Sequence, residues 1–440
     1  MKRKSPSSLI TSFVAYSVAV VLVLVPVHAF LTVWLSSLLG HYTMLRLWKE
    51  GLLLIAGLGV LYILLLSPKL RQQIKREWLW RIIGAYAVVT IICGIFSYVL
   101  GSVTAKAALY GELLDLRPFA MLVIAWIAAS SAPWLYQRWR QLVLAPAAIV
   151  VAVGLLQRFV LPYDVMKHFG YSDSTIWPYE TIDHKTTYIR IRSTLRGANL
   201  LGAYLIVVLS ALGDLFWGKR RQLLISSAIV ASLVTLYASG SRGAWLGALA
   251  AAVVLTWLRL PTPQARKAVF LAGGACLVVL VATVVALRNN DFVQNTVFHT
   301  DEHSTSTVSS NSAHVSYTVD AVKQIVTEPL GRGPGTAGPA SVYNDGHETR
   351  IAENNFLQIG QEAGWLGLGL FVAIYVLVAK QLWVRRRLAL AQVLLASLAG
   401  LTVMALLMHI WTDDTVAYLW FGLAGLILAQ PAKERRAKAR

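Results

Sequence analysis

Long apolar segments recur along the whole chain and constrain its fold more than any other feature of the sequence. A membrane-spanning helix needs roughly 20 mostly apolar residues. Hydrophobic residues make up 57% of the 440 positions and charged residues only 14%, which excludes a soluble protein of this length because its surface would be too apolar. The sequence therefore predicts an all-α polytopic membrane protein, a single membrane domain over residues 1–440 with about twelve transmembrane helices. The predicted spans are 9–29, 50–67, 82–102, 116–133, 141–161, 198–217, 222–239, 243–258, 267–287, 354–379, 388–409 and 415–430.

The first apolar segment is expected to stay in the protein. It is long, contains Pro26 and has no cleavage site of small residues, unlike a signal peptide. Residues 30–39 are also apolar and are predicted to form a short interfacial or re-entrant piece.

The basic residues predict the orientation of the chain. The net charge of +19 does not indicate nucleic-acid binding, because seven short clusters hold 25 of the 40 Lys and Arg residues and all seven fall on one side of a twelve-span bundle. Cytoplasmic loops carry such an excess, so both termini are predicted to be cytoplasmic. The clusters are Lys2–Lys4, Lys69–Arg81, Arg138–Arg140, Lys219–Arg221, Arg259–Lys267, Lys380–Arg387 and Lys433–Arg440.

This orientation leaves one long loop, residues 288–353, on the outer face between spans nine and ten. Within it, apolar residues at helical spacing from Val315 to Ile325, ended by Pro329, predict an amphipathic helix lying along the membrane or over the bundle. The cytoplasmic loops are too short for a catalytic domain, and no phosphate-binding GxxxxGK[ST] motif occurs. The two cysteines fall in predicted spans, where they are expected to pack, and they form neither a disulfide framework nor a CxxC metal site. No cofactor is expected.

Arginines on the predicted outer face are the first candidate functional residues. Arg190, Arg192 and Arg196 precede one span, and Arg242 lies in a tight turn, Ser239–Gly243, between two others. Anchoring in lipid headgroups would explain the first three, but a charge retained close to the hydrocarbon usually has a partner or a function. Guanidinium groups match phosphate oxygens. Several of them at headgroup depth therefore indicate a lipid-linked phosphate or diphosphate.

Three motifs in this region resemble a known family. "RSTLRGANLLGAYL", "SGSRGAWLG" and "EPLGRGPG…ENNFLQIGQEAGWLG" occur in this order over roughly residues 185–370. In order and spacing they are similar to the O-antigen ligase and O-antigen polymerase superfamily of bacterial envelope enzymes. The resemblance implies a GT-C-type glycosyltransferase of the bacterial cytoplasmic (inner) membrane that works without a metal or a nucleotide sugar. Its donor would be a glycan on a polyprenyl diphosphate, and its acceptor a hydroxyl of a glycan, lipid or protein on the outer face.

The resemblance also implies roles for particular residues. Arg192 and Arg242, assisted by Arg196, would hold the donor diphosphate. Ligases of the family carry a histidine just before the asparagine of the last motif, and this chain has Glu353 followed by Asn354. A carboxylate can accept a proton from a hydroxyl, so Glu353 is expected to activate the acceptor.

Other interpretations of these residues remain open. Glu353 and Asn354 could simply offset the dipole of the following helix and cap it. His347, six residues before Glu353, could supply an imidazole base, and His314 could assist in binding phosphate.

The sequence does not separate a ligase from a polymerase, although the ligase is slightly favoured. A lipid-linked glycan flippase or secondary transporter would also fit twelve spans. Such proteins show paired half-sequences and ionisable groups near the span centres, and neither is expected here. A membrane scaffold would not require arginines at several places on the outer face.

Overall fold

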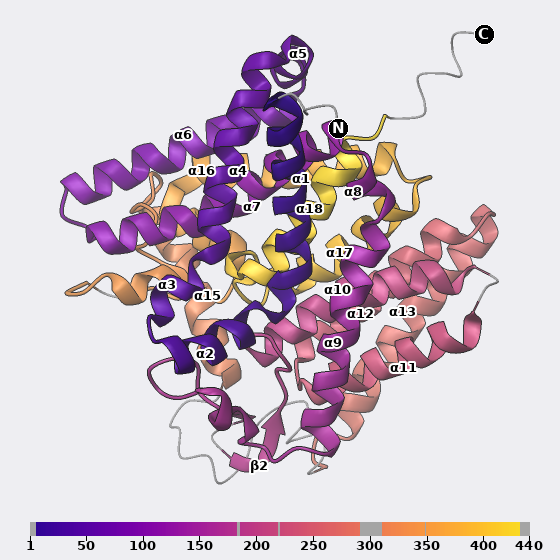
Figure 1. Ribbon diagram of the computed structural model, residues 1–440. Coiled ribbons are helices and arrows are strands. Elements are labelled where there is room, and N and C mark those ends of the chain that lie inside the picture. The colour runs from indigo at the N-terminus through magenta and orange to yellow at the C-terminus, as the bar shows by residue number, and fades with distance from the viewer. Residues whose placement is uncertain (1–5, 183–184, 219–220, 291–309, 348, 432–440) are drawn as a thin grey trace, which may run out of the picture.

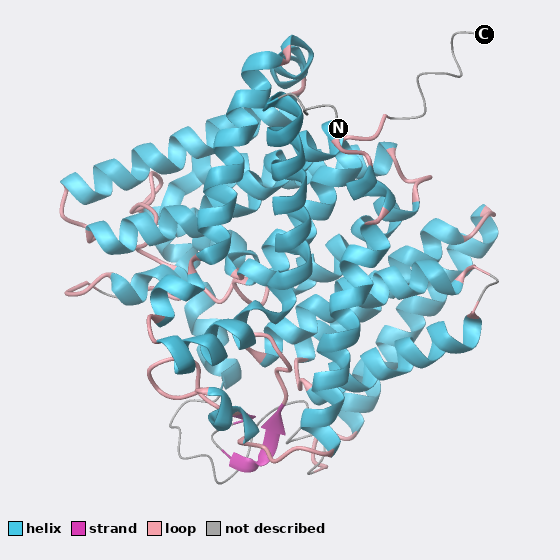
Figure 2. Cartoon of the chain, viewed as in Figure 1, coloured by secondary structure: helices cyan, strands magenta, loops and turns pink. Residues whose placement is uncertain are grey.

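The protein is almost entirely helical (Figures 1 and 2). The computed structural model describes residues 6–182, 185–218, 221–290, 310–347 and 349–431. Its first half contains α1 (Pro6–Leu24), η1 (Val25–Val27), α2 (His28–Leu39), α3 (Tyr42–Arg46), α4 (Trp48–Leu66), α5 (Pro68–Arg76), α6 (Trp78–Val99), α7 (Ala105–Ser131), α8 (Trp134–Gln137), α9 (Trp139–Phe159) and η2 (Val165–Phe169). Next come β1 (Glu180–Ile182), β2 (Lys185–Arg190), α10 (Ala198–Phe216), α11 (Gln222–Ala238), α12 (Arg242–Arg259) and α13 (Pro263–Ala286). The last elements are α15 (Ser310–Thr327), η4 (Gly338–Tyr343), α16 (Asn355–Val384), α17 (Ala389–Ala405), η5 (Ile410–Thr412) and α18 (Asp414–Leu428).

Each predicted span coincides with a helix, so the prediction of an all-α polytopic membrane protein is confirmed in outline. Within the described ranges, eight helical stretches are long and apolar enough to cross a membrane. Three shorter helices, α11, α17 and α18, are also apolar. The exact number of spans and their orientation remain predictions. The apolar residues 30–39 belong to α2, which continues α1 through the turn η1 at Pro26.

One small sheet was not predicted. Strands β1 and β2 pair antiparallel in the loop that precedes α10, with Glu180 opposite Arg190. In Figure 1 this hairpin lies at the end of the molecule opposite the start of α1 and the end of α18. The pairing matters for the site because it fixes the position of Arg190.

The core is built around two helix pairs. Helix α18 is buried along its whole length and packs closely against α7, while α12 packs against both α17 and α10. Gly247 of α12 and Gly400 of α17 meet at their backbones, since a Cβ on Gly247 would lie 2.7 Å from the carbonyl oxygen of Gly400. Small residues at a crossing allow helices in membranes to approach this closely. The contact holds the start of α12 beside the end of α17.

The predicted amphipathic helix is present as α15. Ile325 is buried, whereas Val315, Val319 and Val322 are exposed, so only part of the apolar stripe packs on the protein. The indole N–H of Trp365 in α16 donates to the carbonyl oxygen of Ile325 at 2.8 Å. Helix α15 is thus tied to α16 near its C-terminal end.

The Gly/Pro segment after α15 is also bound to α16. Glu362 is fully buried, and its Oε1 accepts hydrogen bonds from the backbone N–H groups of Gly335 at 2.7 Å and Ala337 at 3.4 Å. Its Oε2 accepts from Gln358 Nε2 at 3.1 Å. A buried carboxylate needs such partners, and Glu362 therefore holds the segment in place.

Gly364 gives a prediction about this attachment. Its φ of 63° is left-handed, and a Cβ there would lie 2.3 Å from the carbonyl oxygen of Pro329. We expect Gly364→Ala to lower the free energy of unfolding by about 1–3 kcal/mol, because overpacking and a strained backbone both oppose the native fold. Denaturant unfolding in detergent measures the loss. Gly369→Ala is the matched control in the same helix, because a Cβ there meets nothing within 4 Å. Equal stabilities of the two variants would contradict the prediction.

The expectation that charges avoid the span centres is wrong. Helix α7 begins at Ala105, capped by Thr104, rather than at residue 116, so Asp115 and Arg117 lie near its middle and are buried. The capping hydroxyl accepts from Ala107 N at 3.2 Å and starts the helix early.

Buried charges also gather between α4, α7 and α18, where they pair with one another. Lys49 Nζ lies 2.9 Å from Asp414 Oδ2 and 3.1 Å from Glu50 Oε2. His28 Nε2 lies 3.4 Å from Asp414 Oδ2, and Arg117 lies 3.6 Å from Glu50 Oε1. Because opposite charges offset the cost of burial only when they are close and well bonded, we interpret this cluster as a structural one.

Candidate active site

A cavity of about 650 Å³ brings together residues from widely separated parts of the chain. Its charged or titratable lining residues are Arg190, Arg242, Glu353 and His409. They come from the end of β2, the start of α12, the residues before α16 and the segment after α17, and α15 contributes Val315 and Thr318. The two ends of the motif region, far apart in sequence, therefore meet at one cavity.

Arg190 is held in place by three elements. Its Nε donates to the carbonyl oxygen of Ser239 at 2.8 Å, and its NH2 donates to Asn199 Oδ1 at 2.5 Å. Burial lowers the pKa of Arg190, and the charges of Arg242 and Arg192 lower it further, while Glu180 acts in the opposite direction. The cavity wall therefore carries closely spaced cations in a poorly hydrated place, which favours an anion.

Arg242 is the first residue of α12, directly after the predicted tight turn. Gly240 takes a φ of 62° in this turn, and a Cβ there would lie 3.3 Å from Arg190 Cγ. The turn thus brings Arg242 and Arg190 to the same wall. A helix N-terminus adds backbone N–H groups and a partial positive charge to that wall.

The structure places Arg192 and Arg196 differently from Arg242. Arg192 is only 3% exposed and lies 3.7 Å from Glu180 Oε1. Among the described residues, it belongs to a small neighbouring pocket rather than to the 650 Å³ cavity. Glu180 in turn accepts from the backbone N–H of Ala198 at the start of α10. Arg196 is exposed and is not among the lining residues.

Glu353 lines the same cavity as Arg190 and Arg242 and has a left-handed backbone, with a φ of 48°. Asn354 caps α16, since its Oδ1 accepts from the backbone N–H groups of Phe356 at 2.9 Å and Leu357 at 3.1 Å. Its Nδ2 donates to the carbonyl oxygen of Leu406 at 3.1 Å. Asn354 therefore caps α16, which is the alternative role predicted for it. Its side chain also connects the start of α16 to the segment after α17.

Neither of the two candidate auxiliary histidines is shown in the cavity. His347 lines a separate polar pocket of about 200 Å³ together with Arg332 and Arg350. His314 belongs to α15, but its side chain lies outside the described part of the structure. Over the described ranges, no group of three or more His, Cys, Asp or Glu side chains is placed to hold a metal ion.

The structure adds His409 to the candidates, a residue that the sequence motifs do not single out. It follows α17 and is one of nine histidines in the chain, without a local pattern to distinguish it. Burial lowers the pKa of His409 to about 4, while the charge of Glu353 acts to raise it. The imidazole is therefore neutral at pH 7.

This lowered pKa predicts how stability depends on pH. In the unfolded chain a histidine titrates near 6.5, so between about pH 6.5 and 4 the unfolded state binds a proton that the folded state does not. Stability is then highest above this window and falls as the pH falls through it. We expect His409→Asn to show a smaller fall in thermal stability than the wild type over the same window. The exposed His168→Asn should behave as the wild type, and identical slopes for all three proteins would contradict the prediction.

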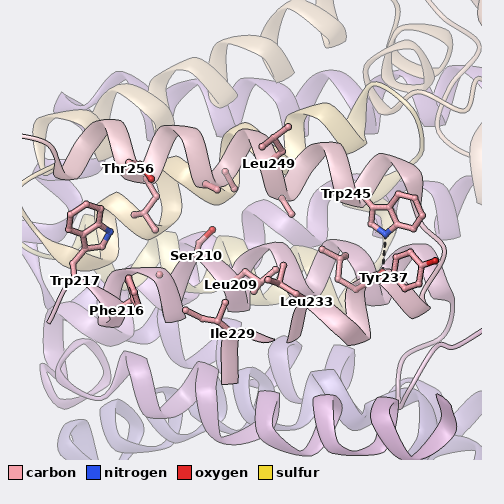
Figure 3. A pocket seen from close by; sticks show the side chains of 16 residues that line it. Leu209, Ser210, Phe216, Trp217, Ile229, Leu233, Tyr237, Trp245, Leu249 and Thr256 are labelled. Atoms are coloured by element: carbon pink, nitrogen blue, oxygen red, sulfur yellow. Dashed lines mark hydrogen bonds between the residues drawn. The ribbon is translucent and has the colours of Figure 1, made fainter. Parts of the chain in front are cut away.

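An apolar groove of about 630 Å³ lies on the other side of the α11–α12 turn, between α10, α11 and α12 (Figure 3). Phe216, Trp217 and Thr256 lie at one end, and Tyr237 and Trp245 at the other (Figure 3). The Tyr237 and Trp245 rings are stacked with centroids 5.6 Å apart. Trp245 lines the groove and its neighbour Leu246 lines the cavity, so the two spaces adjoin along α12.

Comparison with known proteins agrees with the motifs. Residues 227–372, about a third of the chain, match the family described as O-antigen ligase. The matched region contains Arg242 and Glu353, whereas Arg190 and Arg192 precede it. No curated protein matches the chain. The resemblance found in the sequence is thereby confirmed over residues 227–372, where the chain is similar to the O-antigen ligase family.

Proposed function

We propose that this protein transfers a glycan from a polyprenyl diphosphate to an acceptor hydroxyl at the outer face of the bacterial cytoplasmic membrane. The observation that carries the proposal is that Arg190, Arg242, Glu353 and His409 line one cavity. Fixed guanidinium groups stabilise the charge that develops on a leaving diphosphate, and they do so most strongly where water is scarce. Glu353 and His409, which line the same cavity, would contact the acceptor.

The donor would lie across the α11–α12 turn. Its diphosphate binds Arg190 and Arg242, and its polyprenyl chain occupies the adjoining apolar groove, which opens among apolar side chains of three helices. The glycan then extends into the cavity beneath α15, whose residues Val315 and Thr318 form part of the lining. Such a covering element can close over a substrate and exclude water.

Arg192 has a supporting role in this proposal. It pairs with Glu180, which accepts from the first backbone N–H of α10. Since Asn199 in the first turn of α10 binds Arg190, Arg192 helps to position Arg190 rather than to contact the donor directly. This refines the expectation that Arg192 holds the diphosphate itself.

The acceptor hydroxyl attacks the anomeric carbon from the side of Glu353. A C–O bond forms to the acceptor, the C–O bond to the diphosphate breaks, and the electron pair leaves with the polyprenyl diphosphate. Attack from the face opposite the leaving group inverts the anomeric centre. The arginines provide the charge stabilisation, so the reaction requires no metal ion and no nucleotide.

The test is an assay of the purified protein in detergent with a glycan on polyprenyl diphosphate, without ATP or added metal. Release of free polyprenyl diphosphate in the presence of a hydroxyl acceptor supports a transferase. One product size indicates a ligase, and a ladder of longer glycans indicates the alternative, a polymerase of the same superfamily. No release, together with movement of the lipid between leaflets in liposomes, would instead indicate a flippase.

Arg190 gives a specific prediction within this assay. We expect Arg190→Ala to lower the rate about 100-fold, because one fixed donor to a developing anion is worth this much or more. Arg190→Lys should recover only part of the rate, since an ammonium keeps the charge but not the fork that reaches Ser239 and Asn199. The matched control is the exposed Arg158→Ala at the end of α9. A rate within threefold of the wild type in Arg190→Ala would remove Arg190 from the donor site.

A further inference from the structure

The residues around Glu353 are fastened to the segment that carries His409. Asn354 Nδ2 donates to the carbonyl oxygen of Leu406 at 3.1 Å, and Asn355 Oδ1 accepts from the backbone N–H of Trp411 at 3.0 Å. These two bonds flank His409 on either side. They hold the start of α16 and the segment between α17 and α18 in one register, so that Glu353 and His409 line the same cavity.

The imidazole of His409 has an unused nitrogen. Its Nε2 is buried and makes no hydrogen bond with any residue in the described parts of the chain. A buried polar atom without a partner costs free energy, and in a native structure it often marks a functional site. Since His409 lines the cavity and its imidazole is neutral at pH 7, Nε2 can accept a proton from a substrate hydroxyl.

The charges around His409 favour this role once the donor is bound. Glu353 faces the ring from the start of α16, and Asp413 lies on its own segment, where the charge of Arg196 also acts. Arg190 and Arg242 line the cavity with it, and in the proposed function a diphosphate neutralises them. The carboxylate of Glu353, which lines the same cavity, would then stabilise an imidazolium on His409.

We propose that His409 is the catalytic base of the transfer reaction and that Glu353 stabilises its protonated form. The inference rests on the proposed function and deepens it. The acceptor oxygen bonds to the anomeric carbon while its proton moves to Nε2 of His409, and the diphosphate leaves with the electron pair of the broken C–O bond. The imidazolium then returns the proton to water after the product departs.

The experiment compares two nucleophiles in the purified full-length protein, with polyprenyl diphosphate-linked glycan extracted from the source membranes as the donor. A hydroxyl acceptor must lose a proton, whereas azide attacks as an anion and needs no base. His409→Gln keeps a polar group of similar reach but removes the basic nitrogen. We expect His409→Gln to lower transfer to the hydroxyl acceptor by roughly 100-fold or more, and to release polyprenyl diphosphate with azide within threefold of the wild type.

The controls separate the alternatives. His168→Gln, an exposed histidine in η2, should behave as the wild type with both nucleophiles. A His409→Gln protein that transfers to the hydroxyl at the wild-type rate overturns the inference. So does one that loses both reactions, because its defect then concerns the donor or the fold. A wild type that releases no polyprenyl diphosphate with either nucleophile overturns the proposed function itself, and the role of His409 with it.

Discussion

Replacing Arg242 by alanine is expected to lower the rate of glycan transfer about 1,000-fold, the largest effect on activity that the structure predicts. Arg242 joins the two features that the proposed donor site requires, a guanidinium on the cavity wall and the N-terminus of α12. Arginines that stabilise a transferring phosphoryl group contribute on the order of 10³–10⁵ in rate. We expect a loss at the lower end of this range, because Arg190 still provides a positive charge to the diphosphate in the variant.

The measurement is release of polyprenyl diphosphate by Arg242→Ala beside Arg242→Lys and the exposed Arg158→Ala. Arg242→Lys should recover part of the rate, because a positive charge remains although the bidentate geometry is lost. Arg158→Ala should match the wild type. A loss of less than tenfold in Arg242→Ala, with the protein folded, would show that the leaving diphosphate does not depend on this residue.

The rate with azide adds a second criterion. If Arg242 acts on the leaving group, Arg242→Ala should be impaired with azide as much as with a hydroxyl acceptor, because both reactions expel the same diphosphate. His409→Gln should be impaired with the hydroxyl alone. Identical patterns in the two variants would contradict the division of roles between Arg242 and His409.

The largest expected effect on stability concerns Asp414. It lies in the first turn of α18 and is the shared partner of Lys49 and His28. Lys49 is only 1% exposed, so removal of Asp414 leaves a buried cation with Glu50 as its remaining carboxylate partner. Breaking a buried ion pair in this way typically costs about 3–5 kcal/mol. We expect Asp414→Asn to lower the free energy of unfolding by this amount.

Denaturant unfolding in detergent measures the change in the free energy of unfolding. Two further variants test whether the loss comes from the buried ion pair. Asp320→Asn, in an exposed pair with Lys323 on α15, should change stability by no more than about 1 kcal/mol. The double variant Lys49→Met/Asp414→Leu should lose less than the sum of its single variants, since no charge is left without its partner. Additive losses would show that the two residues do not stabilise the fold as a pair.

Much of the architecture could be predicted because it depends on local properties of the chain. Each apolar segment of roughly 20 residues must satisfy its own backbone hydrogen bonds in lipid, and a helix achieves this without any partner. Helix α15 was likewise predictable from the spacing of its apolar residues between a polar start and Pro329. The start of α7 was not, because a single capping threonine extended it eleven residues beyond the apolar segment.

Some residues of the candidate site could likewise be selected from the sequence, and others could not. Arg242 could be selected from the sequence because a charge in a tight turn between two apolar segments is unusual, and Glu353 because it stands where ligases of the resembling family carry a histidine. Arg190 and Arg192 stand two residues apart in one run, and nothing local distinguishes them. Pairing of β1 with β2 and the turn at Gly240 place Arg190 in the cavity, while Glu180 holds Arg192 outside it.

The sequence by itself determined that this is a helical membrane protein with motifs similar to those of the O-antigen ligase superfamily, because hydropathy and short motifs are properties of neighbouring residues. Only the tertiary structure decided which polar side chains share a cavity. His409 lies 56 residues after Glu353, and the bonds of Asn354 and Asn355 bring the two together. Contacts of this kind arise from the packing of whole helices, so no local sequence pattern predicts them.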